Sequence, residues 1–376
     1  MGRLRTFLEE LETWVEYNLA NCIGVDECMK VCPVVDPDLP ISELNEATRP
    51  GTPVPRHIAK FATECIQCGR CDTVCPTSAG RSIMMLYLKA KLTISKRQPR
   101  AYKNYLALKG HDRSSLLIGV FNLFNKPRIR RLAGHVDKQD FRHAPLLFYF
   151  GCYVFSPTRS AVDLIEIADR LGLEYEVLAG LRSCCGWPQL LAGSTDRAED
   201  YHEHLLSLIE KSSPREVVTG CAECFASLVK IKRKYKAGFE VLTPSMWLLQ
   251  HIDGLDIRKS NGKATYHDSC HISRRFHRPE PARELLAKLV DVVEMERSGA
   301  RDTFCCGYWG FKANSDQLES VHAERFAEAR GTGARKMIVE CVTCLESFAL
   351  HPDNAVEVQD IVGLVIERSR LMKDLQ

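Results

Sequence analysis

Ten cysteines in the second half of the chain form two copies of one pattern, and this repeat constrains the fold more than any other feature. In each copy a single cysteine is followed after 31 to 34 residues by Cys-Cys-Gly, and after another 33 to 34 by Cys-x-x-Cys. Corresponding cysteines lie 118 to 121 residues apart, which indicates an internal duplication. The first copy contains Cys152, Cys184, Cys185, Cys221 and Cys224. The second copy contains Cys270, Cys305, Cys306, Cys341 and Cys344.

The number and spacing of these thiols favour an iron–sulfur cluster in each copy. Five thiols exceed the four ligands that a structural zinc ion takes. The sulfur atoms of adjacent cysteines point apart in most backbone conformations, so a single ion is a poor match for the Cys-Cys pair. A cluster of several irons with a bridging thiolate suits the pair better. Zinc and a redox-active dithiol are the alternatives.

A second cysteine-rich region precedes the repeats and contains the run Cys-x2-Cys-x2-Cys-x3-Cys-Pro. The run comprises Cys65, Cys68, Cys71 and Cys75. In ferredoxins with this run, three of the cysteines hold one [4Fe–4S] cluster and the fourth binds the other cluster. The 32 residues that separate it from an earlier run exceed the spacing of compact ferredoxins. We therefore predict a helical two-cluster ferredoxin domain.

The earlier run has the same frame but lacks its second cysteine, because Val25 stands at that position. Under the crossing rule, the four-cysteine site takes Cys32, Cys65, Cys68 and Cys71. The three-cysteine site takes Cys22, Cys28 and Cys75. Valine offers no ligand, so we predict a [3Fe–4S] cluster at the three-cysteine site. An atypical [4Fe–4S] cluster with Asp26 as a ligand is one alternative, and a single cluster in the whole region is another.

Short apolar runs that are typical of buried strands alternate with helical periodicity in both repeats. The runs at 145–150, 217–219, 264–267 and 337–339 each lead into a cysteine. This alternation predicts an α/β layout with parallel strands, in which ligands bind just past the strand ends. The whole chain is then an α+β multidomain protein. We expect a ferredoxin domain at 1–92, a basic helical connector at 93–143, and repeated α/β domains at 144–255 and 256–376.

The connector is strongly basic. Residues 81–142 contain 15 Lys or Arg and three Asp, about +12, whereas the whole chain is +3. The apolar segment 116–124 within it is too short to span a bilayer. A docking surface at 109–131 for a membrane subunit, an acidic partner or the lipid surface is one interpretation, and a solvated linker is the other. No base-stacking or groove-reading motif accompanies the charge, so nucleic acid is not expected.

The two halves, preceded by a ferredoxin region, resemble the CCG-domain iron–sulfur proteins. This family includes the B and D subunits of heterodisulfide reductase, the iron–sulfur subunit of glycolate oxidase and the C subunit of anaerobic glycerol-3-phosphate dehydrogenase. The order and length of the parts are most similar to the D subunit of heterodisulfide reductase. The resemblance implies that the ten repeat cysteines hold two noncubane [4Fe–4S] clusters, which split a disulfide between them. His267-Asp268-Ser269-Cys270-His271 resembles the family's His-Asp-Pro-Cys-His, with serine in place of proline.

Two histidines flank a predicted cluster ligand. His267 and His271 could protonate a departing thiolate, because histidine titrates near neutral pH, or could hydrogen-bond a cluster sulfur. The chain contains no phosphate loop or flavin fingerprint. Electrons must therefore pass to or from a partner: a flavoprotein dehydrogenase, a membrane b-type cytochrome or another quinone-reactive subunit.

The expected function is that of an oxidoreductase subunit that acts together with such partners. The ferredoxin clusters feed the two repeat clusters, which reduce or form a disulfide. The alternative is an electron relay between a flavin-linked dehydrogenase, acting on a 2-hydroxy acid or glycerol 3-phosphate, and the quinone pool. Residues 1–19 indicate an amphipathic helix, not a signal peptide, and the 17 grouped cysteines fit a reducing compartment. We expect a cytoplasmic location, with peripheral membrane contact if the connector docks there.

Overall fold

The computed structural model describes residues 6–34, 38–97, 132, 134–135, 140–155, 158–311 and 315–370. The chain divides into two compact units. The helical unit takes in residues within 1–108, 186–200 and 307–320, and the α/β unit takes in the remainder. Most of the predicted connector, including the apolar segment 116–124, lies outside the described residues. The expectation of a docking surface there therefore stays a prediction.

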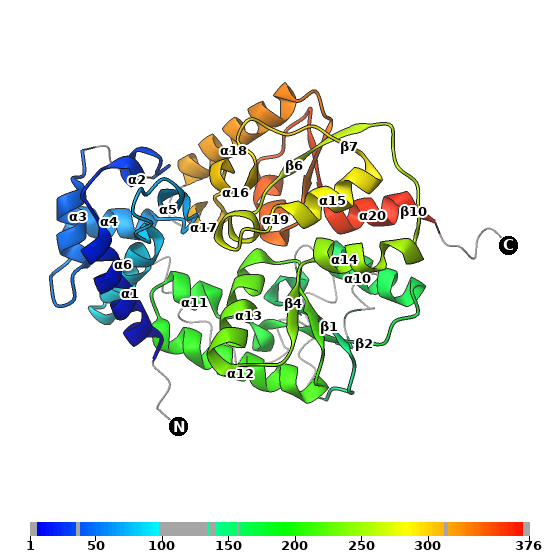
Figure 1. Ribbon diagram of the computed structural model, residues 1–376, viewed down its shortest axis with the longest axis horizontal. Coiled ribbons are helices and arrows are strands. Elements are labelled where there is room, and N and C mark those ends of the chain that lie inside the picture. Colours follow the sequence, from blue (N-terminus) through cyan, green and yellow to red (C-terminus); the bar gives the residue numbers. More distant parts are fainter. Residues whose placement is uncertain are drawn as a thin grey trace. The chain divides into compact units, whose positions relative to one another are not determined.

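Six helices at the start of the chain build the helical unit (Figure 1). They are α1 (Phe7–Asn21), α2 (Glu27–Lys30), α3 (Ile41–Thr48), α4 (Arg56–Glu64), α5 (Arg70–Thr73) and α6 (Arg81–Ile94). A capping box starts α1: the Thr6 hydroxyl accepts from the Glu9 N–H, and the Glu9 carboxylate accepts from the Thr6 N–H. Buried along most of its length, α6 packs against α1, α3 and α4 and forms the spine of the unit.

Two short helices from the cysteine repeats also belong to the helical unit. They are α11 (Trp187–Leu191) and α17 (Tyr308–Phe311), and each follows a Cys-Cys-Gly sequence. Leu191 and Ala192 pack with Trp309, and the Thr93 hydroxyl of α6 donates to the Ala192 carbonyl at 2.6 Å. The chain that follows each Cys-Cys-Gly is thus part of the unit built by the first six helices.

The α/β unit contains two four-stranded parallel sheets. The first consists of β1 (Leu146–Gly151), β2 (Tyr175–Ala179), β3 (Glu216–Val218) and β4 (Glu240–Leu242) in the order β2-β1-β3-β4. The second consists of β6 (Lys263–His267), β7 (Asp291–Val292), β8 (Lys336–Val339) and β9 (Glu357–Asp360) in the order β7-β6-β8-β9. The orders are the same once corresponding strands are aligned, as the duplication predicts. A short antiparallel pair, β5 (Asp256–Ile257) with β10 (Ser369–Arg370), forms a separate ladder.

Helices alternate with these strands along the chain. In the first repeat they are α10 (Thr158–Arg170), α12 (Thr195–Ser212), α13 (Ala222–Tyr235) and α14 (Pro244–His251). In the second they are α15 (Glu280–Leu289), the short α16 (Gly299–Asp302), α18 (Ser315–Gly331), α19 (Val342–Leu350) and α20 (Ile361–Arg368). The fold class expected from the sequence, a helical iron–sulfur region followed by two α/β repeats, is confirmed. Among the described residues no helix is long and apolar enough to cross a membrane.

The cores of the sheets are aromatic and fully buried. Strand β1 is buried at every position, and the rings of Phe148 and Trp247 meet edge to face at 5.2 Å. In the second repeat, Phe348 of α19 packs edge to face on His267 at the end of β6, at 4.9 Å. Parallel strands buried on both faces require such continuous apolar sequence, which is why the strands were predictable.

Gly193, after α11, offers a direct test of the helical unit. Its φ is +77°, and a Cβ atom there would lie 2.2 Å from the backbone oxygen of Lys89 in α6. We expect Gly193→Ala to lower the free energy of unfolding by about 2 to 4 kcal/mol, because it adds left-handed strain and a clash with backbone. Gly331→Ala, where a Cβ meets nothing within 4 Å, is the matched control. Equal thermal unfolding midpoints for the two variants would contradict this packing.

Candidate iron–sulfur sites

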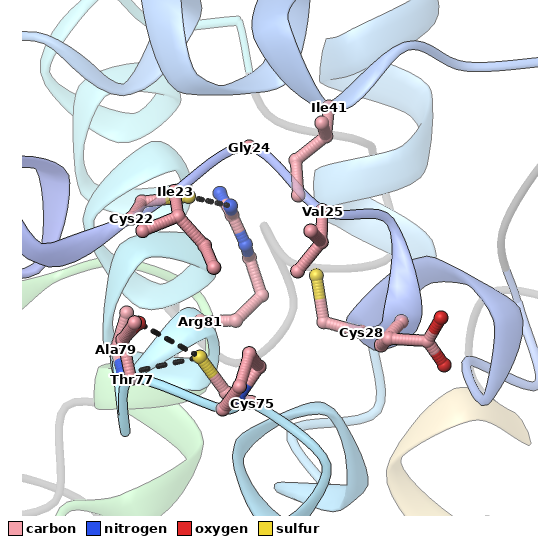
Figure 2. Close-up of a pocket in the computed structure, with 12 residues that line it drawn as sticks. Cys22, Ile23, Gly24, Val25, Cys28, Ile41, Cys75, Thr77, Ala79 and Arg81 are labelled. Atoms are coloured by element: carbon pink, nitrogen blue, oxygen red, sulfur yellow. Dashed lines mark hydrogen bonds between the residues drawn. The ribbon is translucent and has the colours of Figure 1, made fainter.

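The three predicted ligands of the three-cysteine site surround one cavity in the helical unit (Figure 2). Cys22 caps the C-terminal end of α1, Cys28 lies in α2, and Cys75 follows α5. Val25 lines the same cavity, as its place in the cysteine frame predicts. The structure therefore brings together three thiols that are up to 53 residues apart in sequence.

Asp26, the alternative fourth ligand, points elsewhere. Its carboxylate pairs with Lys30 at 3.0 Å, and its side chain is 61% exposed. A hydrogen bond from Lys30 lowers the pKa of Asp26. Asp26 does not line the cavity that Val25 lines. The arrangement thus favours a site with three protein ligands.

The four-cysteine site forms a second cavity in the same unit. Its lining residues include all four predicted ligands, Cys32, Cys65, Cys68 and Cys71. Gln67 and Gly69 between them adopt positive φ angles of 56° and 70°, which fold the Cys-x-x-Cys-x-x-Cys segment tightly. Desolvation by burial raises the pKa of the Cys65 thiol, and raises that of Cys71 well above its usual value. Burial disfavours the thiolate form of these cysteines. A bound metal stabilises the thiolates, so these thiols lose their protons when they become ligands.

Donors around the thiols of the three-cysteine site fit an iron–sulfur cluster. The Ala79 N–H donates to Cys75 Sγ at 3.2 Å, and the Asn45 amide donates to Cys22 Sγ at 3.3 Å. Burial raises the pKa of the Cys22 thiol, but hydrogen bonds from Asn45, the Gly24 backbone and Arg81 lower it more, so the net shift is downward. N–H donors to sulfur are a main means by which proteins tune bound clusters. The thiols would hold the irons, and these donors would stabilise the thiolates.

In the α/β unit the five thiols of each repeat lie beyond the carboxyl ends of the strands. Cys152 directly follows β1, and Cys221 follows β3 as the N-cap of α13. Cys270 and Cys341 occupy the corresponding places after β6 and β8. The edge between β1 and β3, and between β6 and β8, is where the strand order reverses. Sheets of this kind bind ligands at that point.

Within each repeat the thiols are neighbours. Hydrogen bonds to adjacent thiols, together with desolvation, raise the pKa of Cys184, Cys224, Cys270 and Cys344 well above the usual thiol value. Such a group becomes a set of thiolates when a multiply charged metal centre binds. Among the described residues, no three His, Cys, Asp or Glu side chains are placed to hold a single metal ion.

The Cys-x-x-Cys loops of the two repeats contact each other directly. The Val342 N–H donates to the Gly220 carbonyl at 2.9 Å, and the Ala222 N–H donates to Cys341 Sγ at 3.4 Å. Glu223 and Thr343 occupy the same position in their respective loops, and the Thr343 hydroxyl donates to the Glu223 carboxylate at 2.9 Å. Equivalent positions of the two loops thus contact each other, as in a symmetric dimer interface.

Glu223 is buried at this junction and bridges both repeats. The Cys221 thiol donates to its Oε2 at 3.1 Å, and that oxygen lies 3.9 Å from Cys341 Sγ. Its side chain is 5% exposed. The cysteine pattern alone did not single out Glu223, although a carboxylate inside a Cys-x-x-Cys sequence is an unusual neighbour for two thiols. Arg81 was missed in the same way, because nothing in its local sequence links it to the cysteines.

The two histidines that the sequence singled out are buried beside Cys270. His267 ends β6, and its Nδ1 accepts from Arg325 Nε at 3.0 Å, so Nε2 carries the hydrogen. That Nε2 is buried without a partner among the described residues. Desolvation, and then nearby arginines, lower the pKa of both His267 and His271 well below the usual value. Both rings are therefore neutral at pH 7, a state that suits hydrogen bonding to a cluster sulfur.

An ion pair with a buried carboxylate holds the segment that carries these groups. The Asp268 carboxylate accepts from both Arg283 nitrogens at 2.8 Å, from the Gly299 N–H at 2.8 Å and from the Ser273 hydroxyl at 2.8 Å. Asp268 is fully buried. These contacts fix the start of the π-helical turn Cys270–Arg275 and, with it, the position of Cys270.

Comparison with known families agrees with this geometry. The cysteine-rich domain family matches residues 146–229 and again 264–349, and the 4Fe-4S dicluster domain family matches residues 15–76. The chain is a CCG-domain iron–sulfur protein. The matches include all ten cysteines of the repeats and all seven of the helical unit, so iron–sulfur clusters are the cofactors of both parts.

Several relatives of this CCG-domain protein are known by name. It is 26% identical to the B subunit of fumarate reductase (CoM/CoB) of Methanothermobacter marburgensis, over 91% of this chain and 69% of the relative. It is 26% identical to the D subunit of dihydromethanophenazine:CoB–CoM heterodisulfide reductase of Methanosarcina barkeri, over 81% of this chain and 76% of the relative. Lactate utilization protein A 1 of Bacillus cereus is 25% identical over 48% of this chain and 80% of the relative.

The three-ligand arrangement of the three-cysteine site predicts a characteristic EPR spectrum. Oxidised protein should give a [3Fe–4S] EPR signal, because Val25 offers no fourth ligand. Val25→Cys should convert this signal to that of a four-iron cluster, since residue 25 lines the same cavity as the three thiols. Val34→Cys, in the same unit but beside the four-cysteine site, is the control and should leave the signal intact. Two four-iron clusters in the wild type would contradict the assignment.

Proposed function

We propose that this chain is the iron–sulfur electron-transfer subunit of an oxidoreductase complex, in which the ferredoxin clusters feed two repeat-bound clusters that reduce or form a disulfide. The observation that carries the proposal is the direct contact between the two Cys-x-x-Cys loops. Since Cys221 of one repeat and Cys341 of the other share Glu223 as a neighbour, the two repeats present their thiol groups to a common place. A disulfide has two sulfur atoms, and in this arrangement each sulfur could face the cysteine site of one repeat.

The reaction requires two electrons and two protons to convert one disulfide into two thiols. The ten repeat cysteines would hold the clusters, which when bound would supply the electrons one at a time. The chain's own residues hold the ligands in place and exclude water: the ten thiols are mostly buried, and His267 and His271 lie beside Cys270. Because both rings are neutral at pH 7, we assign these histidines to hydrogen bonding at the cluster. Solvent or substrate would then be the source of the protons.

Partner subunits are part of this proposal. The relatives named above include B and D subunits of larger reductases, which supports function within a complex. We propose a flavoprotein dehydrogenase, a membrane b-type cytochrome or another quinone-reactive subunit as the partner. Contact through residues 109–131 with the inner face of the cytoplasmic membrane, in a cytoplasmic protein, belongs to the same proposal.

A second candidate is an electron relay between a flavin-linked dehydrogenase and the quinone pool. The relatives named lactate utilization protein A support it, because lactate is a 2-hydroxy acid; each is 25% identical to this chain over 48% of its length. In that function the repeat clusters would pass single electrons onward without binding a disulfide. The two candidates differ in one product, the thiol.

Thiol release distinguishes them. Anaerobic protein, reduced chemically, should convert an added low-molecular-weight disulfide to thiols in proportion to the electrons stored. Cys344→Ser, which alters one repeat only, should reduce thiol release at least about tenfold while the ferredoxin signals persist. If the reduced wild type transfers its electrons to an artificial quinone but releases no thiol, the relay is correct and the disulfide function is wrong.

A further inference from the structure

Arg81 is a buried cation inside the three-cysteine site. It is the first residue of α6 and only 5% exposed. Figure 2 shows its side chain reaching into the space that Cys22, Val25, Cys28 and Cys75 surround. Its Nη2 donates to Asn45 Oδ1 at 2.7 Å and to Cys22 Sγ at 3.7 Å. Its Nη1 is buried and has no hydrogen-bond partner in the part of the chain that the structure describes.

The same side chain also borders the four-cysteine site. Arg81 and Cys28 line both cavities, so they form the wall between the two groups of thiols. The acid nearest in sequence, Asp72, is occupied with the next residue: it accepts from the Ser82 N–H at 2.9 Å and from the Ser82 hydroxyl. No carboxylate of the described residues lies within ion-pair distance of the Arg81 guanidinium, although ion pairs are frequent elsewhere in the chain.

Folding alone does not account for this arrangement. Burying a guanidinium without an anionic partner costs several kcal/mol, and aliphatic side chains of similar size would avoid that cost. The groups that face Arg81 are thiols. Its positive charge opposes the effect of burial on Cys28, whose pKa desolvation raises. A bound iron–sulfur cluster with thiolate ligands carries net negative charge, and its sulfides accept N–H donors.

We propose that Arg81 is the charge-compensating residue of the three-cysteine cluster: it donates N–H groups to the cluster's sulfur and makes this cluster easier to reduce. The inference rests on the proposed cluster at Cys22, Cys28 and Cys75. Reduction adds one electron, and so one negative charge, to the cluster. A guanidinium has a fixed positive charge and therefore stabilises the reduced state more than the oxidised state. Because Arg81 also borders the four-cysteine site, a smaller effect in the same direction is expected there.

The test is a redox titration of the anaerobic full-length protein, followed by EPR. In Arg81→Gln, the ratio of reduced to oxidised three-cysteine cluster at the wild-type midpoint should fall at least tenfold, which is about 59 mV for a one-electron couple. Arg81→Lys keeps the charge and should stay closer to wild type. Arg49→Gln removes an arginine from the same unit whose side chain is 57% exposed, and screening by water and salt should leave both midpoints unchanged.

Iron content, measured on every variant first, keeps the outcomes separate. Arg81→Gln with full iron and the wild-type midpoint would overturn the role of Arg81. Loss of the cluster in both Arg81→Gln and Arg81→Lys would also overturn it, since the need would then be for shape and not for charge. Loss in Arg81→Gln alone, with retention in Arg81→Lys, would support the proposal. A wild type with no cluster on Cys22, Cys28 and Cys75 would refute the cluster itself, before any variant is compared.

Discussion

The contact between the two Cys-x-x-Cys loops is the interaction on which the proposed function of the α/β unit depends. Each loop begins a helix at the carboxyl end of the third strand of its repeat, at Cys221 and at Cys341. A backbone hydrogen bond from Val342 to Gly220 and the bridge from Thr343 to Glu223 hold the loops together. Gene duplication alone would give two independent sites. This contact makes the two sites a pair, which the proposed disulfide substrate would need.

Charge compensation is the corresponding constraint in the helical unit. Its two groups of thiols are packed in a small apolar core, where clusters bring negative charge. Two cations of α6 are buried there: Arg81 lies between the groups, and Lys89, 3% exposed, donates from Nζ to the Cys65 carbonyl at 2.8 Å. The spine of the unit therefore provides positive charge as well as packing. Net charge and hydrogen bonds to sulfur are among the factors that set a cluster's reduction potential, so under our proposal α6 contributes to the potentials of this unit.

Much of this was predictable from cysteine spacing and strand patterns. The strands 146–151 and 336–339 were expected within one residue, because continuous apolar sequence is required in a doubly covered parallel sheet. The grouping of Cys22, Cys28 and Cys75 followed from the ferredoxin frame. Arg81 and Glu223 were not predictable, since their roles come from tertiary placement beside thiols distant in sequence. Nor could the sequence show that α11 and α17 belong to the helical unit, because short helices carry too little periodicity.

The metal content of the anaerobically purified chain tests the central claim, that all 17 cysteines serve iron–sulfur clusters, most directly. Three and four cysteines in the helical unit and five in each repeat predict about 15 to 16 irons per chain, the lower number if the three-cysteine cluster has three irons. Acid-labile sulfide should be present in about the same amount as iron. Two or more zinc ions per chain, with little iron and no labile sulfide, would contradict the account.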